Sequence, residues 1–178
     1  FLTYEPEHSN RPDIVDSMRV LVLLILTGWS MVAQVPNDLD LFLLIGQSNM
    51  AGRGIIGTEE RKPIPGIWFL AQDLTWKPAV DPLHYDKSQI VGAGLGRPFA
   101  QALLKTDPGK QIGLIPAAFG GSALDEWKRG SEHYNEAIRR TKAALHNGRL
   151  RGILWHQGEA DSGRQELANS YLQRFDVM

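Results

Sequence analysis

The chain has 178 residues, of which 43% are apolar and 22% are charged, and this composition fits one folded domain rather than a disordered chain. Its 19 basic and 20 acidic side chains give a net charge of -1, which argues against a nucleic-acid partner. Cysteine is absent, which excludes disulfides and thiolate metal sites.

The N-terminal part divides into two segments before the expected domain. Residues 1–17 are polar and broken by prolines, and we interpret them as a disordered or mispredicted extension. Residues 18–34 have a basic start, a short apolar run and small residues before a polar continuation, which is typical of a secretory signal peptide. A membrane anchor is the weaker alternative, because the apolar run falls short of about 20 residues, and a buried core segment is another. We expect a secreted or periplasmic protein, with no stable membrane association after cleavage and a mature domain over 35–178.

The first strand of that domain is the clearest structural signal. Five consecutive apolar residues, Leu41–Ile45, predict a strand that is buried on both faces. The run stops at Gly46, and Ser48 follows two residues later. Ligands of open α/β sheets bind at the carboxyl ends of the strands, so Ser48 lies where chemistry is expected. The alternative is that this segment is only a glycine-rich connection.

A long irregular segment follows the first strand. Residues 52–65 are rich in glycine and charge and read as a loop, and Ile67–Leu70 predict a short strand. The segment then continues irregularly to Tyr85. So long an insertion is unusual in a compact domain unless it carries function. Its aromatic side chains either stack on a sugar ring or pack in the interior.

The remaining elements alternate between helices and strands. Helices are predicted over 97–105 and 131–146 and from residue 164 onward, and strands over 112–118 and 153–156. This alternation predicts an α/β fold with a parallel sheet and right-handed crossovers. A doubly wound sheet of this kind normally has five strands, so we interpret these three main strands as part of a longer domain.

The second and third strands also end in polar, glycine-rich segments. The second runs into Gly120, Gly121 and Ser122, and the third runs into Gln157 and Glu159. Three strand ends therefore offer a hydroxyl, unhindered backbone N–H groups, and an amide with acids. These are the parts that an acyl-transfer site requires.

Three motifs at these strand ends carry a family resemblance. They are G-Q-S-N-M at 46–50, G-G-S at 120–122 followed by Trp127, and W-H-Q-G-E-x-D at 155–161. Together they resemble the first three conserved blocks of the SGNH hydrolases, in the branch of the sialate O-acetylesterases and the carbohydrate esterase family 6 acetylxylan esterases. The resemblance implies a three-layer α/β/α flavodoxin-like parallel sheet, incomplete in this chain, whose long insertion helps to wall the substrate cleft.

The resemblance also implies roles for particular residues. Ser48 is the expected nucleophile, and the oxyanion hole is expected from the N–H groups of Ser48 and of Gly121 or Gly120, with the Gln157 side chain as a further donor. Glu159 is expected either to orient the catalytic histidine or to hold the loops as a structural acid. The residues expected around the substrate are Gly120, Asn49, Trp127 and His156.

The general base is expected elsewhere. A serine hydroxyl needs a neighbouring base to accept its proton. In the family this base belongs to a D-x-x-H block that comes after the third motif, and the sequence ends before such a block is reached, so we expect the catalytic histidine and aspartate beyond Met178.

The leading hypothesis is a secreted serine esterase that removes O-acetyl groups from carbohydrates, of the acetylxylan or sialate type, through a Ser48 acyl-enzyme. The expected partner is an acetylated carbohydrate, and neither a cofactor nor a metal is implied. The alternative is a non-catalytic carbohydrate-binding relative. A nucleotide-binding flavodoxin-like protein is disfavoured, because neither G-x-G-x-x-G nor a P-loop follows the first strand.

Overall fold

The computed structural model describes residues 34–178 of the chain. The predicted extension (residues 1–17) and residues 18–33 of the predicted signal peptide therefore lie outside the described residues. In the described part, no helix has the length and apolarity needed to cross a membrane.

A five-stranded sheet in the order β3-β2-β4-β1-β5 forms the centre of the domain. Four strands run parallel, and β3 runs antiparallel to β2 at one edge. The strands are β1 (Leu39–Gly46), β2 (Ile67–Leu70), β3 (Trp76–Pro78), β4 (Ile112–Pro116) and β5 (Gly148–His156). The predicted α/β fold with a mostly parallel sheet is confirmed.

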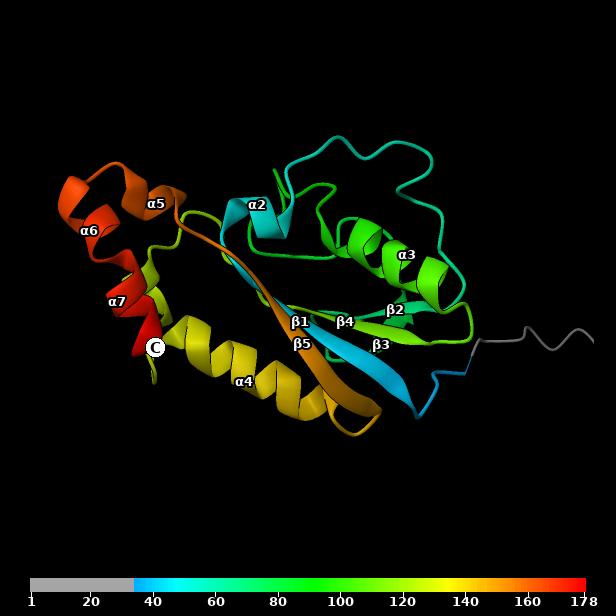
Figure 1. Cartoon of the computed structure of the whole chain (residues 1–178). Helices are drawn as coiled ribbons and strands as arrows, with labels where there is room; N and C mark the ends of the chain where they lie inside the picture. Colours follow the sequence, from blue (N-terminus) through cyan, green and yellow to red (C-terminus); the bar gives the residue numbers. More distant parts are fainter. Residues whose placement is uncertain (1–33) are drawn as a thin grey trace, which may run out of the picture. The chain divides into compact units, whose positions relative to one another are not determined.

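Helices cover both faces of the sheet, which gives three layers (Figure 1). One face carries α2 and α3, the other carries α4, and three short helices lie beyond the carboxyl end of β5. The helices are α2 (Ser48–Ala51), α3 (Gly96–Thr106), α4 (Glu132–Ala144), α5 (Glu159–Ser162), α6 (Gln165–Asn169) and α7 (Tyr171–Asp176), and a 3-10 helix, η1, spans Leu124–Trp127.

The two faces of β1 enter two separate apolar clusters. Leu41 and Leu43 pack in the cluster that includes Ala137 of α4, whereas Leu44 packs in the cluster that includes Ala100 of α3. Both clusters are essentially closed to solvent, since each of these side chains is at most 5% exposed. This burial on both faces is why the β1 sequence is continuously apolar instead of alternating.

Three elements differ from the sequence-based expectation. Trp76–Pro78, in the segment that was expected to be irregular, forms the antiparallel edge strand β3. The third main strand, predicted over 153–156, begins earlier, at Gly148. The helix predicted from residue 164 is instead the pair α6 and α7, which meet at Ser170. The Ser170 hydroxyl donates to the Glu166 carbonyl, so a side chain competes with the regular backbone ladder where the two helices meet.

The position of α4 depends on a buried arginine. Arg140 is 0% exposed and donates from Nη2 to the carbonyl oxygens of Leu70 and Ala71, at the end of β2. Its guanidinium also lies 4.9 Å from the centre of the Tyr85 ring. Burial lowers the pKa of Arg140. Arg140 thus joins α4 to the insertion that follows the first strand.

A buried histidine holds the same insertion against the end of β4. His84 is 4% exposed, and its Nδ1 accepts a hydrogen bond from the backbone N–H of Ala118 at 3.2 Å. Burial lowers the pKa of His84 to about 3, so the ring is neutral at ordinary pH. Ala118 lies two residues before Gly120, and His84 therefore fixes the backbone that leads into the glycine pair.

We predict that His84 makes the domain sensitive to acid. In the unfolded chain the ring takes up a proton below about pH 6.5, whereas the folded protein keeps it neutral down to about pH 3. Acid therefore favours unfolding over this range. Between pH 6 and pH 4, His84 alone is expected to lower the free energy of unfolding by about 2.5 kcal/mol.

Urea unfolding of the wild type and of His84→Asn at both pH values measures this contribution. Asparagine keeps an acceptor at the δ position for the Ala118 N–H but does not titrate, so the variant should lose less stability on acidification. The control His146→Asn removes an exposed histidine and should follow the wild type. An unchanged acid sensitivity in His84→Asn would contradict the prediction.

Candidate active site

The turn after β1 places Ser48 at the carboxyl edge of the sheet. Gly46 has φ of 131°, and a Cβ at this position would overlap the carbonyl oxygen of His156, so only glycine fits. Met50 and Ala51, each 1% exposed, anchor α2 in the core. Ser48 itself is partly exposed, so the residue is not sealed in the interior.

Backbone hydrogen bonds join this turn to the ends of both neighbouring strands. The Phe119 N–H donates to the Gly46 carbonyl at 2.9 Å, and the Gln47 N–H donates to the His156 carbonyl at 2.9 Å. The Gln157 Nε2 also lies 3.3 Å from the Gln47 Oε1. The segments 46–49, 119–122 and 156–161, here called the rim, therefore meet at one place.

The two glycines of the pair differ in their hydrogen bonding. The Gly120 N–H donates to Asp86 Oδ2 at 2.7 Å. In contrast, the N–H groups of Gly121 and Ser48 have no hydrogen-bond partner among residues 34–178. Gly121 has φ of 86°, a conformation that favours glycine. Of the two glycines predicted as oxyanion donors, Gly120 therefore has a partner for its N–H, and Gly121 has none in the part of the chain that the structure describes.

Asp86 holds the Gly120 backbone in place. Its side chain is 2% exposed, and Oδ2 also accepts a hydrogen bond from Arg53 Nη2 at 2.7 Å. Burial raises the pKa of Asp86, but the hydrogen bonds from Arg53 and Gly120 outweigh this effect and leave the pKa below its usual value. A Cβ on Gly120 would overlap the Arg53 guanidinium. Sequence reasoning missed Asp86, for which the length of the insertion was the only signal.

The Gln157 side chain lies at the centre of a hydrogen-bond network. Its Nε2 donates to Asp161 Oδ2 at 2.7 Å and lies 3.1 Å from the Ser122 carbonyl, in addition to the contact with Gln47. Its Oε1 accepts from the Tyr171 hydroxyl at 2.6 Å. An amide nitrogen has two hydrogens, and both are directed at protein oxygens in this arrangement. The role of Gln157 as an oxyanion donor stays a prediction.

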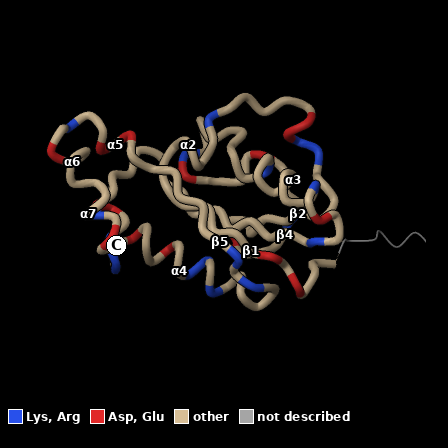
Figure 2. Tube along the Cα trace, viewed as in Figure 1, with Lys and Arg blue, Asp and Glu red and all other residues tan. Residues whose placement is uncertain are grey.

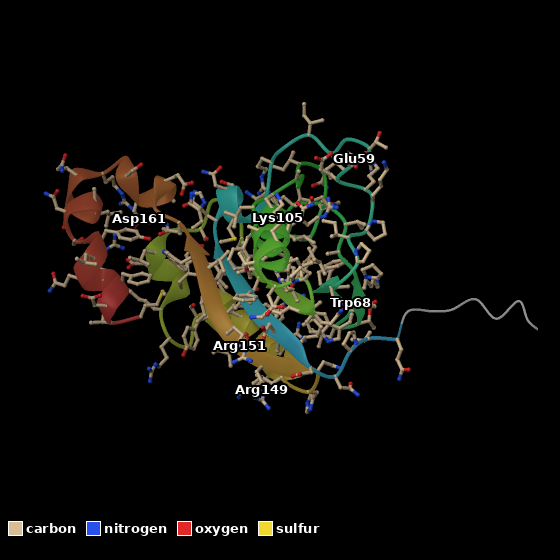
Figure 3. All side chains as sticks on the ribbon, turned by 45° about the vertical axis from the view of Figure 1, so that its right-hand side comes forward. Glu59, Trp68, Lys105, Arg149, Arg151 and Asp161 are labelled. Carbon is tan, nitrogen blue, oxygen red and sulfur yellow. The ribbon has the colours of Figure 1, made fainter. Side chains whose placement is uncertain are left out.

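Asp161 is a buried acceptor in the same hydrogen-bond network. It is 1% exposed, and its two oxygens accept hydrogen bonds from the Leu124 N–H at 2.9 Å and from Arg174 Nη2 at 2.8 Å. Burial raises its pKa, but the bonds from Gln157, Arg174 and Leu124 lower it further than burial raises it. Figure 3 shows Asp161 beyond the carboxyl end of β5, opposite Arg149 and Arg151. Asp161 joins α5 to η1 and α7, a role that its sequence position did not predict.

Glu159, Asn49 and His156 form a more exposed group on the rim. The Asn49 Nδ2 donates to Glu159 Oε1, and the His156 Nε2 lies 3.8 Å from the same oxygen. The His156 and Glu159 side chains are 48% and 42% exposed. All three therefore have surface available to a ligand beside Ser48, as their predicted roles require, although these roles stay predictions.

Trp127 does not have the predicted position. It was expected to bind substrate, but it is 1% exposed and packs against Trp155 with ring centres 5.3 Å apart. Its Nε1 donates to the Ser122 hydroxyl at 2.9 Å. A side chain without accessible surface has no contact to offer a substrate, so this prediction is wrong. Trp127 instead supports the segment that carries the glycine pair.

The opposite end of the sheet has a cavity lined by charged side chains. A cavity of about 490 Å³ lies there, at the amino ends of the strands, and its lining includes Asp40, Lys110 and Arg151. The Asp40 carboxylate pairs with both cations, since Oδ2 lies 3.2 Å from Lys110 Nζ and Oδ1 lies 2.6 Å from Arg151 Nε. No rim residue lines this cavity. Within residues 34–178, no group of three His, Cys, Asp or Glu side chains is placed to hold a metal ion.

Comparison with known proteins gives a consistent family assignment. The family model described as "Carbohydrate esterase, sialic acid-specific acetylesterase" matches residues 38–178. A protein named "Probable carbohydrate esterase" from Arabidopsis thaliana is 38% identical in an alignment of length 161 that covers 79% of this chain. The chain spans 61% of the length of that curated relative.

Solved structures share the fold. The X-ray structure of the same Arabidopsis protein matches with a TM-score of 0.72 and 35% identity, over 80% of this chain and 66% of that one. The crystal structure of NanS matches with a TM-score of 0.64 and 22% identity, over 80% of this chain and 60% of NanS. A carbohydrate acetylesterase from Xanthomonas citri matches with a TM-score of 0.51 and 19% identity, over 78% of this chain and 37% of that one. The last two likenesses concern the fold alone. Since the family model covers most of the chain, the protein belongs to the family of carbohydrate esterases described as sialic acid-specific acetylesterases.

Proposed function

We propose that the protein is a serine esterase that removes O-acetyl groups from carbohydrates. The observation that carries this proposal is that the N–H groups of Ser48 and Gly121 have no hydrogen-bond partner among the described residues and lie at the rim that also carries the Ser48 hydroxyl. Preorganised N–H donors of this kind stabilise the oxyanion that forms when a nucleophile attacks an ester carbonyl. Membership of a carbohydrate esterase family supports the substrate class.

The reaction proceeds in two steps. The Ser48 oxygen attacks the acetyl carbonyl, its proton passes to a base, and the Ser48 and Gly121 N–H groups receive the negative charge on the carbonyl oxygen. Collapse of this intermediate breaks the bond to the sugar oxygen, which takes up the proton from the base and leaves. Water then attacks the acetyl-serine in the same way and releases acetate. Gln157 supports the rim through Asp161 and, if its amide turns toward the carbonyl, adds a third donor.

We propose that the base is a histidine of a D-x-x-H segment that would follow the third motif, and not the buried His84. His156 is the histidine nearest to Ser48 in the strand pairing, since it lies opposite Gly46. No hydrogen bond joins His156 to Ser48 in the described part of the chain, and Glu159 is its close neighbour. We therefore propose that His156 contacts the substrate and that Glu159 either orients the base or holds Asn49.

We further propose that the substrate is an acetylated glycan of the xylan or sialic acid type and that the protein is exported. Export rests on the basic, apolar and small-residue pattern of residues 18–34. N-terminal sequencing of the mature protein tests this part. The expected sequence begins near Gln34, and a mature chain that retains Leu21 would contradict export by cleavage.

Two variants of the full-length protein test the nucleophile and the base together. Ser48→Ala removes the attacking oxygen and should abolish 4-nitrophenyl acetate hydrolysis without changing the thermal unfolding midpoint. His156→Gln keeps the D-x-x-H base and should retain kcat within about threefold while KM for an acetylated sugar rises.

The control Ser88→Ala changes an exposed serine outside the rim and should leave turnover unchanged. Activity retained in Ser48→Ala would remove Ser48 from the mechanism. Loss of kcat in His156→Gln would instead make His156 the base. A full-length wild type that binds acetylated sugars without hydrolysing them would favour a non-catalytic carbohydrate-binding protein.

Asp86 is expected to act by positioning the Gly121 donor. Asp86→Asn weakens the charged hydrogen bonds to Gly120 and Arg53, so the adjacent Gly121 N–H moves away from the developing oxyanion. Because removal of one oxyanion donor costs about 10²- to 10³-fold, we expect a fall in kcat of about 10- to 100-fold, with KM nearly unchanged.

The matched control Asp176→Asn neutralises an exposed carboxylate at the end of α7 and should have wild-type kinetics. Steady-state kinetics on an acetyl ester separate kcat from KM. If Asp86→Asn raised KM and left kcat unchanged, Asp86 would not position the donor.

A further inference from the structure

A second cavity lies beside the rim, along one side of α4. Its volume is about 480 Å³, and it is lined by two aromatic side chains from the loops and four polar side chains from the helix: Tyr85, Phe119, Glu132, Asn135, Glu136 and Arg139. The helix residues follow the spacing of a single helical face. The cavity is therefore a groove between α4 and the loops that lead into the site.

The loop residues of this cavity are direct neighbours of the oxyanion donors. Phe119 precedes Gly121 by two residues, and two residues of extended chain span at most about 7 Å. Tyr85 directly precedes Asp86, which binds the Gly120 N–H. A sugar whose acetyl group lies at Ser48 is thus within reach of the cavity.

The lining has the chemistry of a sugar site. Tyr85 and Phe119 are both partly exposed. Arg140 lies over the Tyr85 ring and His133 stacks on the Phe119 ring, so only the remaining exposed part of each ring offers an apolar surface to the C–H groups of a pyranose ring. Around them, one amide, two carboxylates and one guanidinium can hydrogen-bond to hydroxyl groups. Sites for small ligands combine apolar walls with a few polar groups in this way.

The cavity lining contains two carboxylates but only one cation, so the charges do not all pair. Arg139 donates from Nε and Nη2 to the two oxygens of Glu136, at 2.7 Å each, so these two charges pair with each other. Glu132 is exposed and has no ion-pair partner in the described part of the chain. The acidic residues at the start of α4 are visible along the tube in Figure 2. The ammonium of Lys87 lies near Gly121, because a Cβ there would be 3.7 Å from its Nζ, but Lys87 does not line the cavity.

We propose that this cavity is the subsite for the sugar that carries the acetyl group and that it selects neutral sugars over sugars with a carboxylate, such as sialic acids. Glu132 repels a ligand carboxylate in the cavity. The cation in the lining, Arg139, is already paired with Glu136 and does not offset this repulsion. A neutral sugar meets the same aromatic surface and hydrogen-bonding groups without this repulsion. The inference rests on the proposed esterase function and narrows its substrate class.

Calorimetric titration of the full-length protein with Ser48→Ala, which binds substrate without turnover, tests the subsite. The neutral probes are acetylated xylotriose and 6-O-acetylglucose, and the anionic probe is 9-O-acetyl-N-acetylneuraminic acid. We expect the better neutral probe to bind at least 10-fold more tightly than the anionic one. Adding Glu132→Gln should strengthen binding of the anionic probe about fivefold and leave the neutral probes within twofold.

The matched control is Glu166→Gln, which removes an exposed carboxylate from the first turn of α6 and should change neither affinity. The proposal is overturned if no neutral probe binds, if the anionic probe binds as tightly as the better neutral one, or if Glu132→Gln leaves the selectivity unchanged. Hydrolysis of 4-nitrophenyl acetate by the wild type tests the esterase function separately. Turnover without selective sugar binding would contradict the subsite alone, and selective binding without turnover would contradict the esterase function alone.

Discussion

The site depends on the way in which the turn after β1 is bonded to the strands on both sides of it. The Gly46 carbonyl accepts the Phe119 N–H, and the Gln47 N–H reaches the His156 carbonyl. Both bonds require a backbone at residue 46 with no side chain, because a Cβ would overlap His156. Neighbouring strands of a parallel sheet end at one edge, and these bonds convert that general property into a fixed arrangement of three loops.

Two buried carboxylates, Asp86 and Asp161, accept hydrogen bonds from several polar groups at or near the rim. Asp86 binds the Gly120 N–H and Arg53, so the glycine pair is held by its first member while the N–H of Gly121 has no partner in the described part of the chain. Asp161 binds Gln157, Leu124 and Arg174 and so fixes the loop after β5. Hydrogen bonds to charged groups contribute about 1.5–3 kcal/mol each, which is enough to hold a loop that has no sheet partners.

The sequence predicts the parts of this arrangement that depend on local patterns. The buried strand at Leu41–Ile45 and the α4 helix follow from apolar runs and helical spacing, and the three polar strand ends follow from where those runs stop. Asp86 was not predictable, because its partner Gly120 lies 34 residues away and no local pattern joins them. The burial of Trp127 and the network around Asp161 were missed for the same reason, since each depends on packing between segments that are distant in sequence. The exposed positions of Asn49, Glu159 and His156 agree with the surface that their predicted roles need, but their chemistry stays a prediction.

In this account the Ser48 hydroxyl and the N–H groups of Ser48 and Gly121 act on one carbonyl. The most direct measurement is a crystal structure of the full-length protein after reaction with a methylphosphonate ester, whose phosphoryl oxygen occupies the place of the oxyanion. The account predicts a covalent bond from phosphorus to the Ser48 oxygen, with the phosphoryl oxygen within about 3.1 Å of both the Ser48 and the Gly121 nitrogens. A phosphonate on another residue, or a phosphoryl oxygen bound away from Gly121, would contradict it.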